Sequence, residues 1–170
     1  MDENKVIPLL PLRGMLVFPG MIINLDVGRD RSIKAVEAAM AIDRKILLVT
    51  QREAGTIEPN ENDLFTYGVI AEIKQLLKLP NGALRILVEG FTRAKIEAVR
   101  DNKDIYFEAE VQEVASIIDD SNEVEALKRM LIETFEQWIL ASKKITSEVL
   151  LTFKDQPDPG RIADMIAGYL

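Results

Sequence analysis

The sequence predicts an α+β protein in which a β-rich part is followed by an all-helical part. From residue 21 to about residue 115, most apolar side chains recur at every second position, which is the spacing of half-buried strands. From residue 120 onward they recur at every third or fourth position, as in amphipathic helices. One helical pattern, over residues 30–42, interrupts the first part. We therefore expect two domains, residues 1–117 and 118–170.

Length and composition are those of a folded protein with a sizeable core. The 170 residues are 48% hydrophobic and 29% charged, ordinary values for a globular domain. A formal net charge of −7 repels phosphate backbones and argues against non-specific nucleic-acid binding. The chain has no cysteine, no secretory signal pattern and no apolar stretch that could span a bilayer. We expect a cytoplasmic protein with no membrane partner.

The first segment, residues 7–19, is apolar but contains three prolines, each of which lacks a backbone donor. This pattern favours a short edge strand and argues against a central one. A loop and a turn at Pro19-Gly20 follow. Arg13 is the only charge between Lys5 and Asp26, and we interpret it as a structural residue that holds the loop. The alternative is that the loop presents exposed apolar side chains to a partner.

The next elements are a strand, a helix and a second strand. Residues 21–27 alternate as a half-buried strand, and the helix over residues 30–42 is expected to be capped by Asp30 or Ser32. Its apolar face consists mostly of alanines, which would let it lie close to a sheet. Residues 45–50 predict a strand that is buried on both faces. The polar residues 51–63 predict a surface loop.

A long hairpin dominates the rest of the β-rich part. Residues 67–79 predict a strand with a bulge near Gln75, and Asn81-Gly82 predicts a tight turn. The returning strand covers residues 84–89, Gly90 is expected to break the pairing, and residues 92–99 form a further strand. Residues 105–114 alternate most clearly of all. The tip of the hairpin projects from its sheet, so its leucines either pack back onto the sheet or remain exposed.

Three helices are expected after residue 119. Asp120 and Glu123 resemble a capping box for a helix that ends near Lys143. A short helix covers residues 147–153, and Asp158-Pro159 begins a third, with a cap followed by proline. The third pattern is still apolar at Leu170, so we expect the chain to be part of a longer protein.

The sequence offers no candidate for catalysis. It lacks histidine and cysteine, the commonest general base and the commonest metal ligands. It contains no glycine-rich phosphate loop. Asp119, Asp120 and Glu123 are the nearest approach to a carboxylate metal site, but acids at a helix start are more simply explained by the helix dipole. We therefore expect no catalytic residue, no metal site and no cofactor here.

Four separated motifs resemble the N-terminal domain of bacterial ATP-dependent Lon proteases. They are L-L-P-L-R-G-M-L-V-F-P-G-M, V-G-R-D-R-S-I-K-A-V-E-A-A, L-K-L-P-N-G-A-L-R-I-L-V-E-G-F-T-R-A and D-P-G-R-I-A-D-M-I-A. The resemblance implies a PUA-like curled sheet or pseudo-barrel with one helix, followed by the start of a helical bundle. It also implies that the ATPase module, with its ATP and magnesium, and the Ser-Lys peptidase module lie outside this chain. Implied partners are unfolded or damaged proteins and other protomers of a homo-oligomer.

We hypothesise that the chain is a binding module that recognises unfolded proteins through apolar surface. A scaffolding role in oligomer assembly is the main alternative, and a PUA-like nucleic-acid-binding role a weaker one. The candidate substrate-contact residues are Met15, Leu16, Phe18, Leu76, Leu77 and Leu79. The residues to which we assign structural roles are Arg13, Pro19, Gly20, Asn81 and Gly82.

Overall fold

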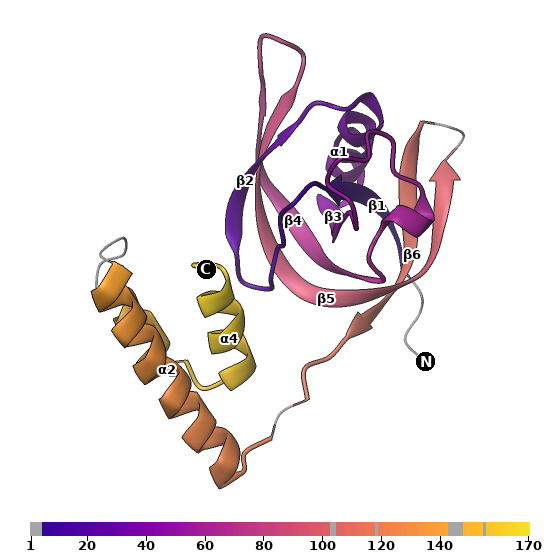
Figure 1. Ribbon diagram of the computed structural model, residues 1–170. Coiled ribbons are helices and arrows are strands. Elements are labelled where there is room, and N and C mark those ends of the chain that lie inside the picture. Colours follow the sequence, from indigo (N-terminus) through magenta and orange to yellow (C-terminus); the bar gives the residue numbers. More distant parts are fainter. Residues whose placement is uncertain (1–4, 103–104, 118, 143–147, 155) are drawn as a thin grey trace. The chain divides into compact units, whose positions relative to one another are not determined.

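A computed structural model describes residues 5–102, 105–117, 119–142, 148–154 and 156–170 (Figure 1). The chain forms two compact units, the first ending at Ala115 and the second beginning at Ser116. The division predicted from the sequence lies after Ile117. The first unit contains two apolar cores and the second contains one.

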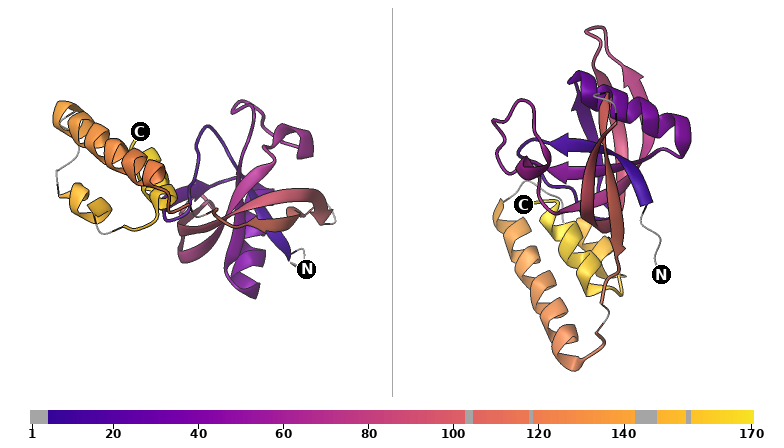
Figure 2. Two further views of the ribbon diagram at one scale, coloured as in Figure 1. Left: turned by 90° about the horizontal axis from the view of Figure 1, so that it is seen from below. Right: turned by 90° about the vertical axis from the view of Figure 1, so that its right-hand side faces the viewer.

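The first unit is a curled sheet of six strands. In chain order they are β1 (Lys5–Leu12), β2 (Ile22–Val27), β3 (Lys45–Thr50), β4 (Tyr67–Lys78), β5 (Leu84–Asn102) and β6 (Tyr106–Val114). The strand order is β2-β5-β4-β3-β1-β6, and β6 also pairs with β5. Five strands therefore close into a ring, and β2 is an additional strand on the first half of β5 (Figure 1, Figure 2). This confirms the predicted α+β pseudo-barrel.

Strand β1 lies inside the sheet, so the expectation of an edge strand is wrong. It pairs with β6 over residues 5–8 and with β3 over residues 9–12. The carbonyl oxygen of Leu12 points toward β3, where it accepts from the N–H of Gln51 at 2.8 Å. Because successive residues face opposite sides, Pro11 directs its nitrogen toward the β6 side, beyond the end of that pairing at Pro8. Pro11 thus falls where no donor is needed.

Strand β5 is continuous over 19 residues, and Gly90 does not break it as expected. Gly90 pairs with Ala71 of β4, and its N–H donates to the carbonyl oxygen of Met21 at 2.9 Å. A Cβ at position 90 would lie 2.6 Å from the carbonyl oxygen of Phe18. The glycine therefore lets the loop that precedes β2 lie directly against β5.

The β4–β5 hairpin has its bulge and its turn where the sequence predicts them. The register shifts between Ile73 and Gln75, and a second shift follows Ile70. Gly82 has a φ of +83°, and its N–H donates to the carbonyl of Leu79 at 3.0 Å. Asn81 does not adopt a positive φ; its side chain instead accepts from the N–H of Ala83 at 3.1 Å. Asn81 and Gly82 thus stabilise the turn in different ways.

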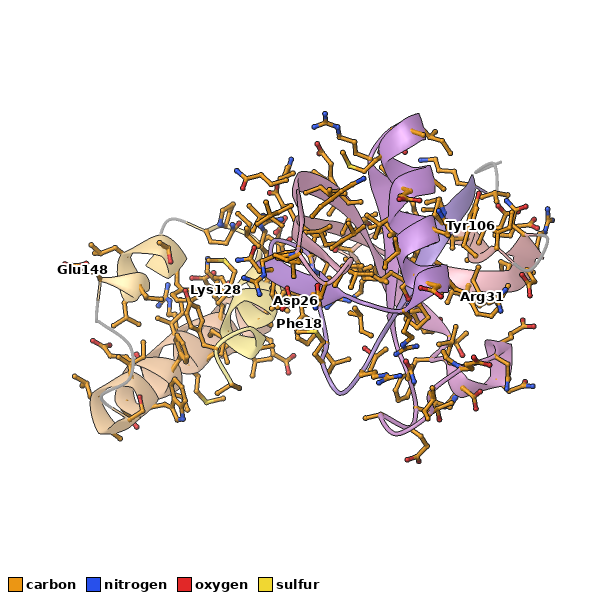
Figure 3. All side chains as sticks on the ribbon, turned by 90° about the horizontal axis from the view of Figure 1, so that it is seen from above. Phe18, Asp26, Arg31, Tyr106, Lys128 and Glu148 are labelled. Carbon is orange, nitrogen blue, oxygen red and sulfur yellow. The ribbon has the colours of Figure 1, made fainter. Side chains whose placement is uncertain are left out.

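Helix α1 (Asp30–Ile42) covers one face of the sheet with small side chains, as predicted. Neither expected cap is present, because the N-cap residue is Arg29 and no side chain caps the helix. Figure 3 shows Arg31 near the start of α1; its guanidinium pairs with Asp101 and lies 3.9 Å from the ring centroid of Phe107. A short 3₁₀ turn, η1 (Glu61–Asp63), lies in the predicted loop.

Alternation along β3 divides the apolar interior of the first unit into two cores. Ile46 and Leu48 belong to the core that α1 covers, and Leu47 and Val49 belong to the other. The second core takes side chains from all five strands of the ring, so it fills the interior of the barrel. Strand β3 is therefore buried on both faces, as predicted.

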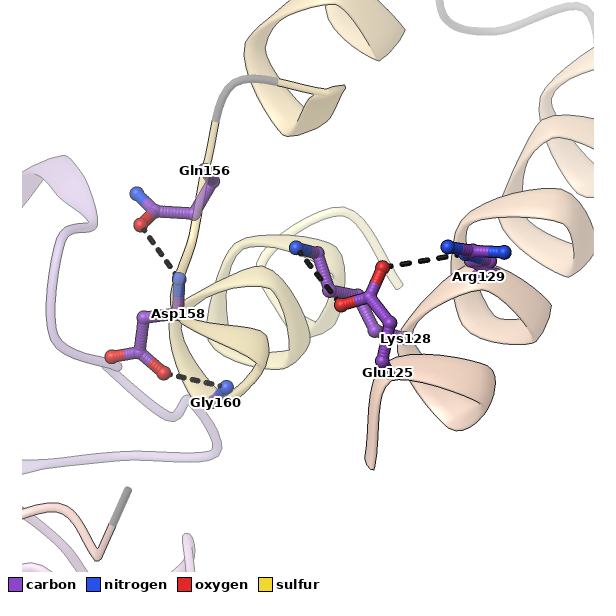
Figure 4. Close-up of polar contacts among 6 residues, drawn as sticks. All are labelled: Glu125, Lys128, Arg129, Gln156, Asp158 and Gly160. Carbon is purple, nitrogen blue, oxygen red and sulfur yellow. Dashed lines mark hydrogen bonds and ion pairs between the residues drawn. The ribbon is translucent and has the colours of Figure 1, made fainter. Parts of the chain in front are cut away.

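The second unit contains α2 (Asn122–Ser142), α3 (Val149–Lys154) and α4 (Pro159–Ala167). The predicted capping box at Asp120 is wrong: the hydroxyl of Ser121 accepts from the N–H of Val124 at 3.3 Å. Asp158 caps α4 as predicted, accepting from the N–H of Gly160 at 2.8 Å (Figure 4). The predicted end of the first helix at Lys143 and the predicted start of the second at Ser147 lie outside the described residues.

An aromatic cluster forms the core of the second unit. The rings of Phe135 and Trp138 stack with centroids 5.6 Å apart, and Phe135 meets Phe153 edge to face at 5.4 Å. Aliphatic side chains of all three helices complete the core: Ile139, Leu150, Ile162 and Ile166. Leu127, near the start of the predicted apolar stripe, is exposed, so this core covers only the second half of α2.

Within the described residues, no helix is both long and apolar enough to cross a membrane. The same residues contain no group of three histidine, cysteine, aspartate or glutamate side chains that could hold a metal ion.

Candidate functional site

A groove of about 670 Å³ lies in the first unit between the end of β1, the inner side of β2 and the start of α1. Its volume is within the range of small-ligand sites. Its apolar lining includes Leu10, Leu12, Leu25 and Val27, which belong to the core that α1 covers. The remaining lining residues include three arginines: Arg13, Arg29 and Arg85. The groove can therefore take an extended segment that is apolar on one side and polar on the other.

The arginines of the groove differ in their partners. Arg85 makes two hydrogen bonds to the carboxylate of Asp26, at 2.7 and 2.8 Å. These bonds hold the pKa of Asp26 below its usual value. The guanidinium of Arg29 donates instead to the amide oxygen of Gln51 at 2.5 Å. Partial burial of Arg29, together with the nearby charge of Arg13, lowers the pKa of its guanidinium.

The loop after β1, residues 13–21, is tied down at several points. Arg13 donates to the carbonyl oxygen of Ile57 at 3.2 Å. The hydroxyl of Thr50 donates to the carbonyl of Met15 at 2.7 Å. Gly20 has a φ of +87°, and its N–H donates to the carbonyl of Gly90 at 2.7 Å. The loop is thus a bound part of the sheet surface.

The candidate contact residues of this loop differ in exposure. Leu16 is 60% exposed, whereas Met15 is partly buried against the core and lines the groove. Phe18 (Figure 3) and Pro19 are partly buried. Of the loop residues proposed to contact a substrate, Leu16 offers the largest exposed fraction.

The tip of the β4–β5 hairpin shows a similar division. Leu77 is 58% exposed and lies opposite Arg85 in the ladder with β5. Leu76 points to the other face and packs against the core. Leu79 is partly buried. Alternation along the strand therefore leaves one strongly exposed leucine at the tip, in place of three.

The structure does not bring the loop and the hairpin tip together. Strand β2 pairs with β5 from Ile22, opposite Glu89, to Val27, opposite Leu84. The loop joins β5 next to Glu89, and the hairpin turn lies beyond Leu84. The two candidate segments are therefore separated by the six residues of β2, or about 20 Å at a typical rise per residue.

Two exposed apolar residues near the loop were not predicted as contact residues. Ile22 is 65% exposed, and its outward direction follows from the alternation of β2, in which Leu25 and Val27 are buried. Phe91 is 47% exposed, with the ammonium of Lys74 5.2 Å from its ring centroid. The alternation of β2 was sufficient to predict Ile22. The register shift next to Phe91 was not visible in the sequence.

The fold is that of Lon N-terminal domains. It matches the N-terminal domain of a Lon protease from the Mycobacterium avium complex with a TM-score of 0.77 and 24% identity, over 95% of this chain and 81% of that one. A Lon N-terminal domain protein from Xanthomonas campestris matches with a TM-score of 0.56 and 20% identity, over 98% and 99%. These two likenesses show a shared fold.

The chain belongs to the family of the ATP-dependent protease La (LON) substrate-binding domain, whose family model matches residues 6–170. It is 52% identical to a Lon protease of Desulforamulus reducens and 49% identical to that of Escherichia coli K12, each over 99% of this chain. Lon protease 1 of Bacillus subtilis is 46% identical over the same share. The chain spans about a fifth of the length of these relatives, 21–22%.

Proposed function

We propose that this chain is the substrate-engaging part of an ATP-dependent Lon-type protease and binds unfolded or damaged proteins through exposed apolar side chains. The observation that carries the proposal is that large apolar side chains remain exposed at two separate places: Leu16, Ile22 and Phe91 at the loop after β1, and Leu77 at the hairpin tip. Unfolded chains expose apolar side chains that folded proteins bury, so such a surface discriminates between the two.

In the proposed protease, modules outside this chain would bind ATP and cleave the substrate. ATP and magnesium would bind in an ATPase module, and a Ser-Lys dyad would cut peptide bonds, both outside this chain. A cytoplasmic homo-oligomer would present several copies of the binding surface to one substrate. Weak binding by a single copy would then be strengthened by avidity.

A titration with a fluorescent, permanently unfolded polypeptide tests the proposal. We expect Leu77→Asp to weaken binding severalfold, because a carboxylate at the hairpin tip opposes apolar contact. Ile105→Asp is the matched control, since Ile105 is 47% exposed but lies beyond the opposite end of β5. Equal binding by wild type and by the Leu77→Asp variant would remove the hairpin tip from the proposed surface.

A scaffolding role is the second candidate, and one observation on the second unit favours it. Leu127, Met130 and Leu140 on α2 are each more than half exposed, so part of this helix has no cover within its own unit. Sedimentation across a concentration series tests self-association of the chain. A strict monomer at every concentration would argue against this role for the isolated chain.

A further inference from the structure

The start of α1 presents backbone donors that have no partner. Arg29 occupies the N-cap position without a side-chain cap, and the first helical hydrogen bond runs from the N–H of Ile33 to the carbonyl of Arg29 at 2.9 Å. Within the described residues, the N–H groups of Asp30, Arg31 and Ser32 make no hydrogen bond to the protein. The first turn of a 13-residue helix with free N–H groups attracts negative charge.

The side chain of Ser32 lies at the same place. Ser32 is only 6% exposed, and its side chain has no hydrogen-bond partner among the residues that the structure describes. It lines the groove and also an adjoining hollow of about 410 Å³. The Ser32 oxygen is not among the buried atoms that lack a partner, so it is open to the hollows and can donate to a molecule placed there.

Two nearby guanidinium groups have no carboxylate partner in the described part of the chain. Arg29 is held by the amide oxygen of Gln51, whose own amide nitrogen donates to the carbonyl oxygens of Glu53 and Thr56, at 3.3 and 3.0 Å. Arg13 is held by a backbone carbonyl. Both arginines are thus positioned by neutral acceptors, and their charges remain available to a ligand.

The other charges around the helix start limit the ligand to a small negative charge. Asp26 is already paired with Arg85, and Arg31 with Asp101. The exposed carboxylates of Asp30 and Glu58 also lie at the second hollow and oppose a highly charged anion. The small excess of positive charge that remains suits a single carboxylate better than a phosphate.

Apolar side chains line both hollows beside the start of α1. The groove contributes leucine and valine side chains. The second hollow is lined in part by Leu9, Ile57, Pro59 and Phe107. A carboxylate that is attached to an apolar side chain can therefore place its charge at the helix start and its side chain in a hollow.

We propose that the first turn of α1, with Ser32 and Arg29, binds the terminal carboxylate of a peptide that ends in apolar residues. This inference rests on the proposed function, because it specifies which part of a protein substrate is recognised. The donors are the free N–H groups, the Ser32 hydroxyl and the Arg29 guanidinium. These donors would recognise any small oxyanion, so free phosphate is the competing ligand.

Fluorescence anisotropy with a labelled apolar hexapeptide tests the site on the whole chain. The free acid should bind about tenfold more tightly than the C-terminal amide, the factor expected for losing charge-assisted hydrogen bonds. Arg29→Gln and Ser32→Ala should each reduce this preference. Lys34→Gln, on the exposed face of the same helix, should retain it. Unchanged thermal unfolding of each variant would show that its fold is intact.

Equal binding of acid and amide would overturn the inference. So would phosphate binding at the same residues without a preference for the peptide acid, because the ligand would then be the free anion. The long unfolded polypeptide separates this inference from the proposed function. Binding of that polypeptide that depends on Leu77, without any preference for a free carboxylate, would remove the site and leave the proposed function standing.

Discussion

The carbonyl oxygen of Phe18 occupies the space that a side chain at Gly90 would need, since a Cβ there would lie only 2.6 Å from it. Gly90→Ala must push the loop away from β5 or distort the strand. We expect the substitution to destabilise the first unit by about 1–3 kcal/mol, the usual cost of overpacking. Urea unfolding followed by far-ultraviolet circular dichroism measures the loss.

Gly55→Ala is the matched control for Gly90→Ala, because nothing lies within 4 Å of a Cβ at position 55. It should leave the unfolding midpoint nearly unchanged. If both variants unfolded like the wild type, the close approach of Phe18 to β5 would be wrong.

Arg13 connects the loop after β1 to the loop after β3 through one hydrogen bond, to the carbonyl oxygen of Ile57. Arg13→Ala should therefore destabilise the first unit only moderately, by roughly 0.5–1.5 kcal/mol, the net value of a typical hydrogen bond. Arg13→Lys keeps a charged donor and should recover part of the loss. An unchanged melting temperature for Arg13→Ala would contradict its structural role.

Local sequence patterns predicted most elements of the fold but, apart from the β4–β5 hairpin, not their pairing. Alternation was sufficient for β2 and β6, and a continuous apolar run was sufficient for β3, which is buried on both faces. Pro8 and Pro11 suggested an edge strand, yet β1 is internal because its two halves pair with different neighbours. Gly90 suggested a break, but its role depends on a residue more than seventy positions earlier in the chain. Long-range register of this kind is not encoded in a local pattern.

The candidate site was only partly predictable for the same reason. Leu16 and Leu77 are exposed, and the burial of Leu76 follows from strand alternation. The helix-start site depends on Gln51, which lies 22 positions from Arg29 and holds it. The cap was expected at Asp30 or Ser32, so the uncapped helix start at Arg29 was not predicted.

The ion pair of Asp26 and Arg85 gives a pH-dependent prediction. The hydrogen bonds from Arg85 lower the pKa of Asp26 in the folded state, so the folded protein binds fewer protons there than the unfolded chain. The stabilisation is complete above the unfolded pKa and is lost as the pH falls through the folded value. The difference in melting temperature between wild type and Asp26→Asn should therefore be largest near neutral pH and shrink in acid.

Both side chains of this pair are at least half exposed. The difference in melting temperature should therefore be small and should also decrease with added salt. A difference that grew on acidification would have the wrong sign for this ion pair. Such a result would show that Asp26 affects stability through something other than Arg85.

Phe153 is fully buried in the aromatic cluster of the second unit. Phe153→Ala should destabilise that unit by about 3–5 kcal/mol, the typical cost of removing a buried aromatic ring. Trp138 is the only tryptophan of the chain and stacks on Phe135, so its fluorescence reports on the second unit. Leu151→Ala, at a 64% exposed position, is the control and should leave the fluorescence transition unchanged.

The central claim is that exposed apolar side chains of the first unit contact unfolded protein. Photoreactive amino acids placed at Met15, Leu16 and Leu77, with Ile105 as control, test it most directly when crosslinks to an unfolded model substrate are mapped by mass spectrometry. We predict crosslinks from the loop and the hairpin tip that excess unlabelled substrate suppresses, and few from position 105. Crosslinks only between copies of the chain would contradict the claim and favour the scaffolding role.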